Sequence, residues 1–310
     1  MPTYRPHASA AAHGTQKPAR AVQRLTALIA LSLSFSAHAD LTLGAAPGAR
    51  LTATGGVSQI EGSGGGGLVP WALISGYASA DQIGGSAFVT RVDTGDFRLD
   101  SGGGALGIGD RVELSYALQR FDLGTTVPGA SIRMDIVGAK IRLAGDAVYD
   151  QDRWLPQLAL GVQYKHNRDF DFVPKALGAN RGDDWDAYLA ASKVWIDGPF
   201  GRSLLANLTL RATRANQLGL LGFGGDKSDA HRIEPEASLG LFLRDDLVLG
   251  AEYRAKPDNL SAFREDAFAD VFVAWFPSKR LSITAAWTDL GNIADKPHQQ
   301  GAYLSLQIAH

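Results

Sequence analysis

The sequence predicts an all-β fold: a transmembrane antiparallel up-and-down β-barrel of 12 strands, with 14 as the alternative, preceded by a Gly-rich N-terminal segment. Three observations predict it. Large apolar residues recur at every second position of many segments. These segments run for roughly 10 to 14 residues, which is close to the length that a tilted strand needs to cross a bilayer. Short turns and long loops alternate between them, as they do in transmembrane barrels.

The first 39 residues differ from the rest of the chain. Four basic residues precede the apolar run Leu25–Phe35, which is followed by the small-x-small triplet Ala37-His38-Ala39. This is the layout of a cleavable secretory signal peptide, which we place at residues 1–39. This run of eleven residues is too short for a helix that spans a membrane. We therefore expect the protein to be exported.

The next part, residues 40–67, is rich in glycine and leaves two alternatives open. It forms either a plug or a first strand, and the barrel is expected over residues 68–310. Counting Leu51–Thr54 and Leu68–Tyr77 as strands gives the alternative of 14. The glycine run at residues 102–107 has the spacing of a dinucleotide-binding loop, but a strand follows it instead of a helix. We therefore interpret that run as a turn.

Four segments show the two-residue period most clearly: residues 158–165, 203–213, 281–288 and 304–309. In each, one face of the strand carries large apolar side chains and the other carries small or polar ones. A soluble sandwich would bury the apolar face, whereas a membrane barrel would turn it toward lipid. The segments are longer than ordinary globular strands, which favours the barrel.

Twelve strands are expected in chain order. An even number of strands places both chain ends on the same side of the membrane, which we expect to be the periplasmic side. The expected ranges are 87–92, 97–101, 111–123, 131–143, 154–166, 186–196, 201–215, 232–243, 247–256, 267–276, 280–289 and 299–310.

Several motifs suggest a family. They are Leu51–Trp71, Val148–Pro156, Ala215–Lys227, Gly250–Leu260, Ala274–Lys279 and Asp289–Ala294. Together they resemble a porin-like family of proteobacterial outer-membrane barrels known as domain of unknown function 3034. The resemblance covers nearly the whole chain after residue 39. It implies a Gram-negative outer membrane as the location and a barrel as the shape, with no assigned reaction.

The inward rows of the expected strands carry charges of both signs. A buried charge without water or a partner is costly, so these side chains indicate either a wet channel or a network of ion pairs across the lumen. The expected lumen-lining residues are Lys165, Asn207, Arg211, Glu236, Glu252, Arg254 and Asp270.

Two expected loops have unusual compositions. One contains the apolar residues Leu218, Leu220, Leu221 and Phe223. An apolar loop often marks a contact, so it either meets a hydrophobic solute or packs over the barrel mouth. The other loop, residues 167–185, is dense in charge. Its carboxylates either hold a divalent cation that bridges lipopolysaccharide or are solvated.

Nothing in the sequence predicts an enzyme. The chain has no cysteine, which excludes disulfides, thiolate metal sites and a cysteine nucleophile. Its net charge of −2 gives no reason to expect nucleic acid. His166, His231 and His298 are expected at the outer mouth without the spacing of a catalytic or metal site. We predict no catalytic residue, cofactor or metal.

The predicted function is a porin-like channel through which small solutes pass passively or bind. One alternative is a transporter of hydrophobic compounds with an N-terminal hatch. Alternatives from other classes are a structural or surface-exposed barrel and a barrel hydrolase. The expected partners are outer-membrane lipids, lipopolysaccharide, the barrel assembly machinery and an unidentified solute.

Overall fold

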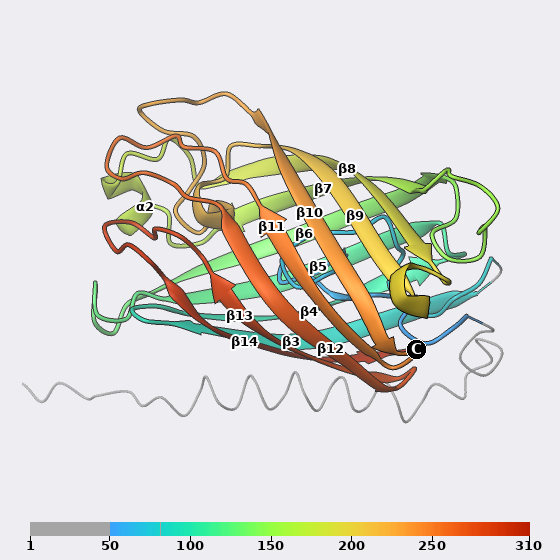
Figure 1. Cartoon of the computed structure of the whole chain (residues 1–310). Helices are drawn as coiled ribbons and strands as arrows, with labels where there is room; N and C mark the ends of the chain where they lie inside the picture. Colours follow the sequence, from blue (N-terminus) through green and yellow to red (C-terminus); the bar gives the residue numbers. More distant parts are fainter. Residues whose placement is uncertain (1–49, 81) are drawn as a thin grey trace, which may run out of the picture. The chain divides into compact units, whose positions relative to one another are not determined.

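A computed structural model describes residues 50–80 and 82–310. The predicted signal peptide and residues 40–49 lie outside the described residues. Twelve antiparallel strands form a closed barrel in which each strand pairs with its neighbours in the chain, and β14 closes the ring against β3 (Figure 1). The predicted all-β barrel of 12 strands is confirmed.

The barrel strands lie close to their predicted ranges. Their bounds are β3 Ile83–Thr94, β4 Arg98–Ile108, β5 Val112–Asp122, β6 Ser131–Ala144, β7 Gln157–Asn167, β8 Asp183–Trp195, β9 Leu204–Thr213, β10 Arg232–Arg244, β11 Leu247–Arg254, β12 Phe268–Ser278, β13 Leu281–Asp289 and β14 Gln300–Ala309.

Strand β7 shows why the alternating sequence folds this way. Leu160, Val162 and Tyr164 are each about half exposed on the outer surface, whereas Gln163 and Lys165 are buried inside. Successive side chains of a strand point to opposite faces, so one apolar row faces out and one polar row faces in. The same division holds in β9, β13 and β14.

The two ends of the barrel differ. The longest loops gather at one end, where α2 (Val173–Ala176) and the short 3-10 helix η2 (Asn216–Gly219) also lie (Figure 1). Shorter turns, including the 3-10 helix η1 (Pro199–Gly201), and the C-terminus lie at the other end. We call these the long-loop end and the short-turn end. No helix among the described residues is long and apolar enough to cross a membrane.

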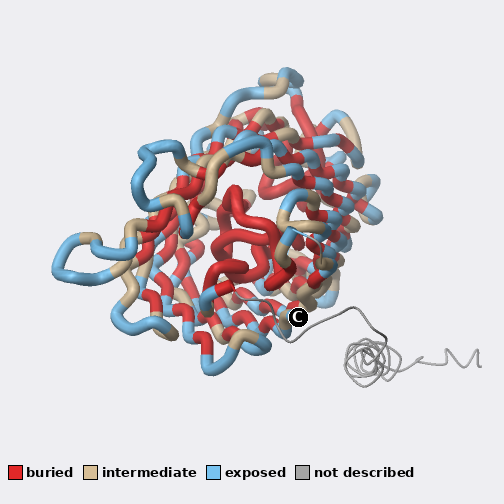
Figure 2. The backbone as a smooth tube through the Cα atoms, turned by 90° about the vertical axis from the view of Figure 1, so that its right-hand side faces the viewer, coloured by how far each residue is buried: buried red, intermediate tan, exposed pale blue. Residues whose placement is uncertain are grey.

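The first barrel strand begins at Ile83, later than the predicted start at residue 68. Residues 50–80 form no barrel strand. They run inside the ring of strands, as the buried stretch in Figure 2 shows. The apolar residues of 68–77 pack against the interior of the barrel, and alternation alone does not distinguish such burial from contact with lipid.

The interpretation of the glycine run at residues 102–107 as a turn is wrong. The run lies within β4, and the turn comes after it, at residues 109–111. A run of glycines has no side chains that would reveal a two-residue period. At Gly107 a Cβ would lie 2.4 Å from the carbonyl oxygen of Ser75, so a glycine there lets residues 50–80 approach the barrel wall.

Candidate functional site

The lumen is filled by residues 50–80, which we call the lumen segment. Almost all of its side chains are buried (Figure 2). Its two short strands, β1 (Val57–Ser58) and β2 (Gly64–Gly65), pair with each other and with no strand of the barrel. The backbone NH of Ile60 donates to the carbonyl oxygen of Gly67 at 3.0 Å. The segment is therefore a compact folded unit inside the barrel.

Glycine lets the lumen segment touch the barrel wall. A Cβ built on Gly66 would lie 1.9 Å from the Oε1 atom of Glu252, which is closer than any real contact. A larger residue there would displace the Glu252 carboxylate. The run Gly64–Gly67 thus places the backbone directly against polar groups of the wall.

Glu61 connects the lumen segment to several strands at once. Its carboxylate pairs with the Nζ atom of Lys165 on β7 and, at 2.8 Å, with the Nη1 atom of Arg254 on β11. The Nη2 atom of Arg211 on β9 lies 3.8 Å away. All four side chains are buried. One carboxylate of the segment therefore interacts with cations on three strands.

Two carboxylates of the wall complete this cluster. Asp186 lies 2.7 Å from Lys165 and 3.3 Å from Arg211, and Glu236 lies 2.5 Å from Arg211 and 3.2 Å from Arg254. We call these six residues the Glu61 cluster. It holds three acids and three bases, so it is neutral only while Glu61 is in place.

The charge of Glu61 is stabilised by its surroundings. Burial alone would raise the pKa of Glu61, but attraction to Arg254, Lys165 and Arg211 outweighs burial and holds that pKa well below its usual range. Glu61 therefore remains ionised at neutral pH.

A second contact lies on β5 and β6. The carboxylate of Glu113 accepts hydrogen bonds from the backbone NH groups of Gly64 at 3.0 Å and Ser75 at 2.8 Å. Its partner Lys140, 3.1 Å away, donates to the carbonyl oxygen of Gly64 at 2.9 Å. This buried pair therefore hydrogen-bonds both NH groups and a carbonyl oxygen of the segment's backbone.

A third contact lies on β10 and β11. Glu252 accepts a hydrogen bond from the backbone NH of Leu68 at 2.7 Å and another from the hydroxyl of Ser238. The indole NH of Trp71 donates to that same hydroxyl at 2.8 Å. Asp270 pairs in register with Glu252 on the neighbouring strand, and its Oδ1 atom has no hydrogen-bond partner among the described residues.

The apolar loop residues lie in the core rather than on the surface. Leu218, Leu220, Leu221 and Phe223 are each at most 5% exposed. The carbonyl oxygen of Leu218 accepts a hydrogen bond from Lys165 at 3.2 Å, so this loop reaches the Glu61 cluster. Of the two alternatives, the burial of these apolar side chains favours packing over the mouth.

The burial of Phe223 leads to a stability prediction. Phe223 is fully buried, so Phe223→Ala is expected to lower the free energy of unfolding by about 3 kcal/mol or more. Phe200→Ala is the matched control, because Phe200 is 92% exposed on η1, and it should change stability little. Unfolding in detergent with increasing guanidinium measures both. Equal, small effects would mean that Phe223 does not pack as described.

The structure buries all seven residues that the sequence places in the lumen. Lys165, Arg211, Glu236 and Arg254 belong to the Glu61 cluster, and Glu252 binds the lumen segment directly.

The other two lumen residues are held less closely to the segment. Asn207 accepts a hydrogen bond from the hydroxyl of Ser192 at 2.7 Å, and its Nδ2 atom lies 3.5 Å from the carbonyl oxygen of Pro70. The Oδ1 atom of Asp270, unpartnered among the described residues, makes no hydrogen bond to the segment. Buried charges of the Glu61 cluster, Glu252 and the pair of Glu113 and Lys140 thus bind the lumen segment, together with neutral side chains such as Gln157, which donates to the carbonyl oxygen of Ala72 at 2.7 Å.

Sequence reasoning did not name several residues that hold the segment. Glu113, Lys140 and Asp186 lie on inward rows of their strands, so the same two-residue period that indicated Lys165 could have found them. Glu61 has no such signal, because the lumen segment has no regular period.

The charged loop at residues 167–185 pairs its carboxylates with cations. Asp169 binds Arg133 at 2.8 Å, Asp171 binds Lys175 at 2.8 Å, and Asp184 binds Arg214. The described residues include no group of three acidic, histidine or cysteine side chains that could hold a metal ion. His231 stacks on Trp185 with ring centroids 4.4 Å apart.

The sequence profile of the family described as Protein of unknown function (DUF3034) matches residues 54–307. The chain belongs to this family. The match includes most of the lumen segment and the barrel from β3 to residue 307 of β14. Among proteins with curated descriptions, none matches it.

Solved structures of other barrels resemble this DUF3034 protein in part. The KdgM porin has a TM-score of 0.45 and 10% identity, covering 72% of this chain and 98% of that one. The outer membrane protein Omp33 of Acinetobacter baumannii has a TM-score of 0.42 and 11% identity, covering 74% of this chain and 98% of that one. The outer membrane phospholipase A of Escherichia coli has a TM-score of 0.39 and 8% identity, covering 72% of this chain and 92% of that one.

Proposed function

We propose that this DUF3034 protein is an outer-membrane channel for small polar solutes and that the lumen segment closes it. The observation that carries the proposal is the occupied polar lumen: a closed barrel whose inward charges bind a folded segment of the same chain. Inward rows of this polarity suit a hydrated solute. The alternative of hydrophobic transport loses its main support, because Leu218–Phe223 are buried.

The outer surface supports a membrane location. Apolar side chains on most barrel strands, among them Leu208, Val271 and Leu304, are more than half exposed. A contiguous apolar surface of this kind on a water-soluble protein would promote aggregation. A closed barrel satisfies its backbone hydrogen bonds within the bilayer, so lipid can cover this surface. Transmembrane barrels have their short turns on the periplasmic side, so the short-turn end faces the periplasm.

This location predicts the effect of a charge on the outer surface. Val271 is 59% exposed on β12, and Val271→Arg is expected to destabilise the lipid-embedded barrel by about 2 kcal/mol. In a water-soluble protein the same change would be nearly neutral. Val271→Leu is the matched control. Unfolding from phospholipid vesicles measures both, and a neutral Val271→Arg would contradict contact with lipid at this site.

Opening does not require the barrel itself to open. The strand ladder closes on itself through β14 and β3, and no strand of the lumen segment takes part in it. The segment can therefore leave the lumen, wholly or in part, while the wall stays paired. Local unfolding of one folded unit inside a more stable frame is common in proteins.

Several partners follow from this function. The apolar surface lies against outer-membrane lipids, the long loops lie near lipopolysaccharide, and the barrel assembly machinery inserts the strands.

A hydrolase would need a nucleophile near a base. The ring of His231 lies 3.1 Å from the carbonyl oxygen of Trp185 and 3.8 Å from the carboxylate of Asp184. Neither of these neighbours is a hydroxyl or thiol that the histidine could activate. His231 therefore gives no support to the hydrolase.

Planar-bilayer recording of the full chain tests the proposal. A channel closed by the lumen segment should show infrequent stepwise openings that become more frequent when local unfolding of the segment is promoted by dilute urea. Folded protein that gives no step under any of these conditions would instead support a structural barrel.

A further inference from the structure

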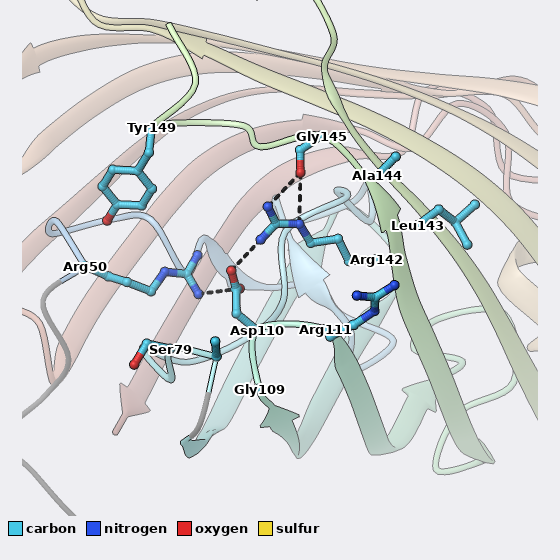
Figure 3. Close-up of a pocket in the computed structure, with 11 residues that line it drawn as sticks. Arg50, Ser79, Gly109, Asp110, Arg111, Arg142, Leu143, Ala144, Gly145 and Tyr149 are labelled. Atoms are coloured by element: carbon cyan, nitrogen blue, oxygen red, sulfur yellow. Dashed lines mark hydrogen bonds and ion pairs between the residues drawn. The ribbon is translucent and has the colours of Figure 1, made fainter.

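One cavity of about 400 Å³ lies at the short-turn end and is separate from the lumen contacts described above (Figure 3). Both ends of the lumen segment line it, through Arg50 and through Ser79–Ala80. The rest of the lining comes from the turn that contains Asp110 and Arg111, and from the end of β6 with the following turn, through Arg142 and Tyr149. The cavity thus joins the segment to two turns of the wall.

Three arginines and one carboxylate line this cavity, so it carries a surplus of positive charge. Asp110 binds the Nη1 atoms of Arg50 at 2.7 Å and of Arg142 at 2.5 Å. Arg142 also donates to the carbonyl oxygen of Gly145 and pairs with Asp146. Both arginines are thereby held in place before any ligand arrives.

Two of these arginines have N–H groups without a hydrogen-bond partner among the described residues. The Nε atom of Arg50 is buried and has no hydrogen-bond partner among the described residues. The guanidinium of Arg111 is exposed and has no partner in the part of the chain that is described. A guanidinium presents paired N–H groups that match the two oxygens of a carboxylate or a phosphate. The unused donors therefore suit an oxyanion.

We propose that this cavity is a binding site for a small soluble oxyanion, a carboxylate or a phosphate, which Arg111 engages directly beside Arg50 and Arg142. Asp110 occupies part of the site as an internal anion. A bound oxyanion competes with Asp110 for Arg50, which begins the described part of the lumen segment. The site is independent of whether the barrel conducts.

Titration calorimetry of the full chain in neutral detergent tests the site, with succinate and inorganic phosphate as probes at constant ionic strength. Saturable binding of at least one probe is expected. Arg111→Gln should weaken it at least tenfold. Arg280→Gln is the matched control, because Arg280 is also an exposed arginine and lies on the short turn between β12 and β13. It should change the dissociation constant less than twofold.

A second variant is expected to act in the opposite direction. Asp110→Asn removes the internal anion and should tighten binding at least threefold. Asparagine tolerates the positive φ of 48° at this position. No saturable binding of either probe to the wild-type protein would overturn the proposal. Equal losses in Arg111→Gln and Arg280→Gln, binding seen only with anionic lipid present, or weaker binding by a folded Asp110→Asn variant would overturn it as well.

Discussion

Replacing Glu61 with glutamine is expected to raise the frequency of channel openings at least tenfold. The change removes the one carboxylate that the lumen segment contributes to the Glu61 cluster, leaving three cations of the wall against two acids. Removing one partner of a buried ion pair costs about 3 kcal/mol or more. The loss destabilises the closed state, in which the lumen segment occupies the lumen. Single-channel recording in planar bilayers measures the effect.

The matched control removes a carboxylate from an exposed ion pair. Asp93 pairs with Arg98 at 2.5 Å on the surface, where both side chains are about half exposed. Exposed pairs contribute little, so Asp93→Asn should leave the opening frequency unchanged. If both variants open equally often, or if folded Glu61→Gln protein opens as rarely as the wild type, the Glu61 cluster does not hold the channel closed.

Linking the lumen segment to the wall should have the opposite effect. The backbone NH of Ala72 donates to the Oγ atom of Ser192 on β8 at 2.8 Å, and both residues are fully buried. Cysteines at these two positions should form a disulfide, and the chain has no other cysteine to compete. In a Glu61→Gln background, the oxidised pair should reduce the swelling rate of sugar-loaded liposomes to that of liposomes without the protein.

Single-cysteine variants provide the control for this link. Ala72→Cys and Ser192→Cys, each in the Glu61→Gln background, should swell as fast as Glu61→Gln alone. Thiol titration reports whether the disulfide has formed. Fast swelling of fully oxidised protein would show that solute passes without movement of the segment near residue 72.

The barrel could be predicted because most of its strands carry a periodic signal, although the glycine-rich part of β4 does not. Large apolar side chains are exposed on the outer surface at every second position over much of β7 and β14: Leu160, Val162 and Tyr164 in β7, and Leu304, Leu306 and Ile308 in β14. Lipid on one side and polar groups on the other impose that period on any strand of the wall. The ends of strands are harder to predict, as β4 shows: it continues through the glycines at 102–104, which carry no side chains.

The lumen segment could not be predicted in the same way. Its residues contact several strands through backbone groups and single side chains, so no regular spacing is required of them. The apolar stretch Leu68–Ile74 could equally be a strand in lipid or a core, and composition alone allows both. The glycines at 64–67 indicate a close approach, but only the structure reveals that the approach is to Glu252.

The contacts within the Glu61 cluster could not be predicted either, because they depend on the tertiary structure. Lys165, Arg211 and Arg254 stand on β7, β9 and β11, and the period of each strand indicates that each points inward. Nothing in these strands indicates that the cations converge on one carboxylate from a distant, non-periodic part of the chain. The loop at Leu218–Phe223 is ambiguous for a similar reason, because its composition fits burial and contact alike.

The most direct measurement records the Glu61→Gln, Ala72→Cys, Ser192→Cys variant in one planar bilayer, first oxidised and then after addition of a reductant. If movement of the lumen segment opens the channel, the oxidised protein stays closed and stepwise openings begin once the disulfide is reduced. Openings of the same size and frequency before and after reduction would contradict a lumen closed by this segment.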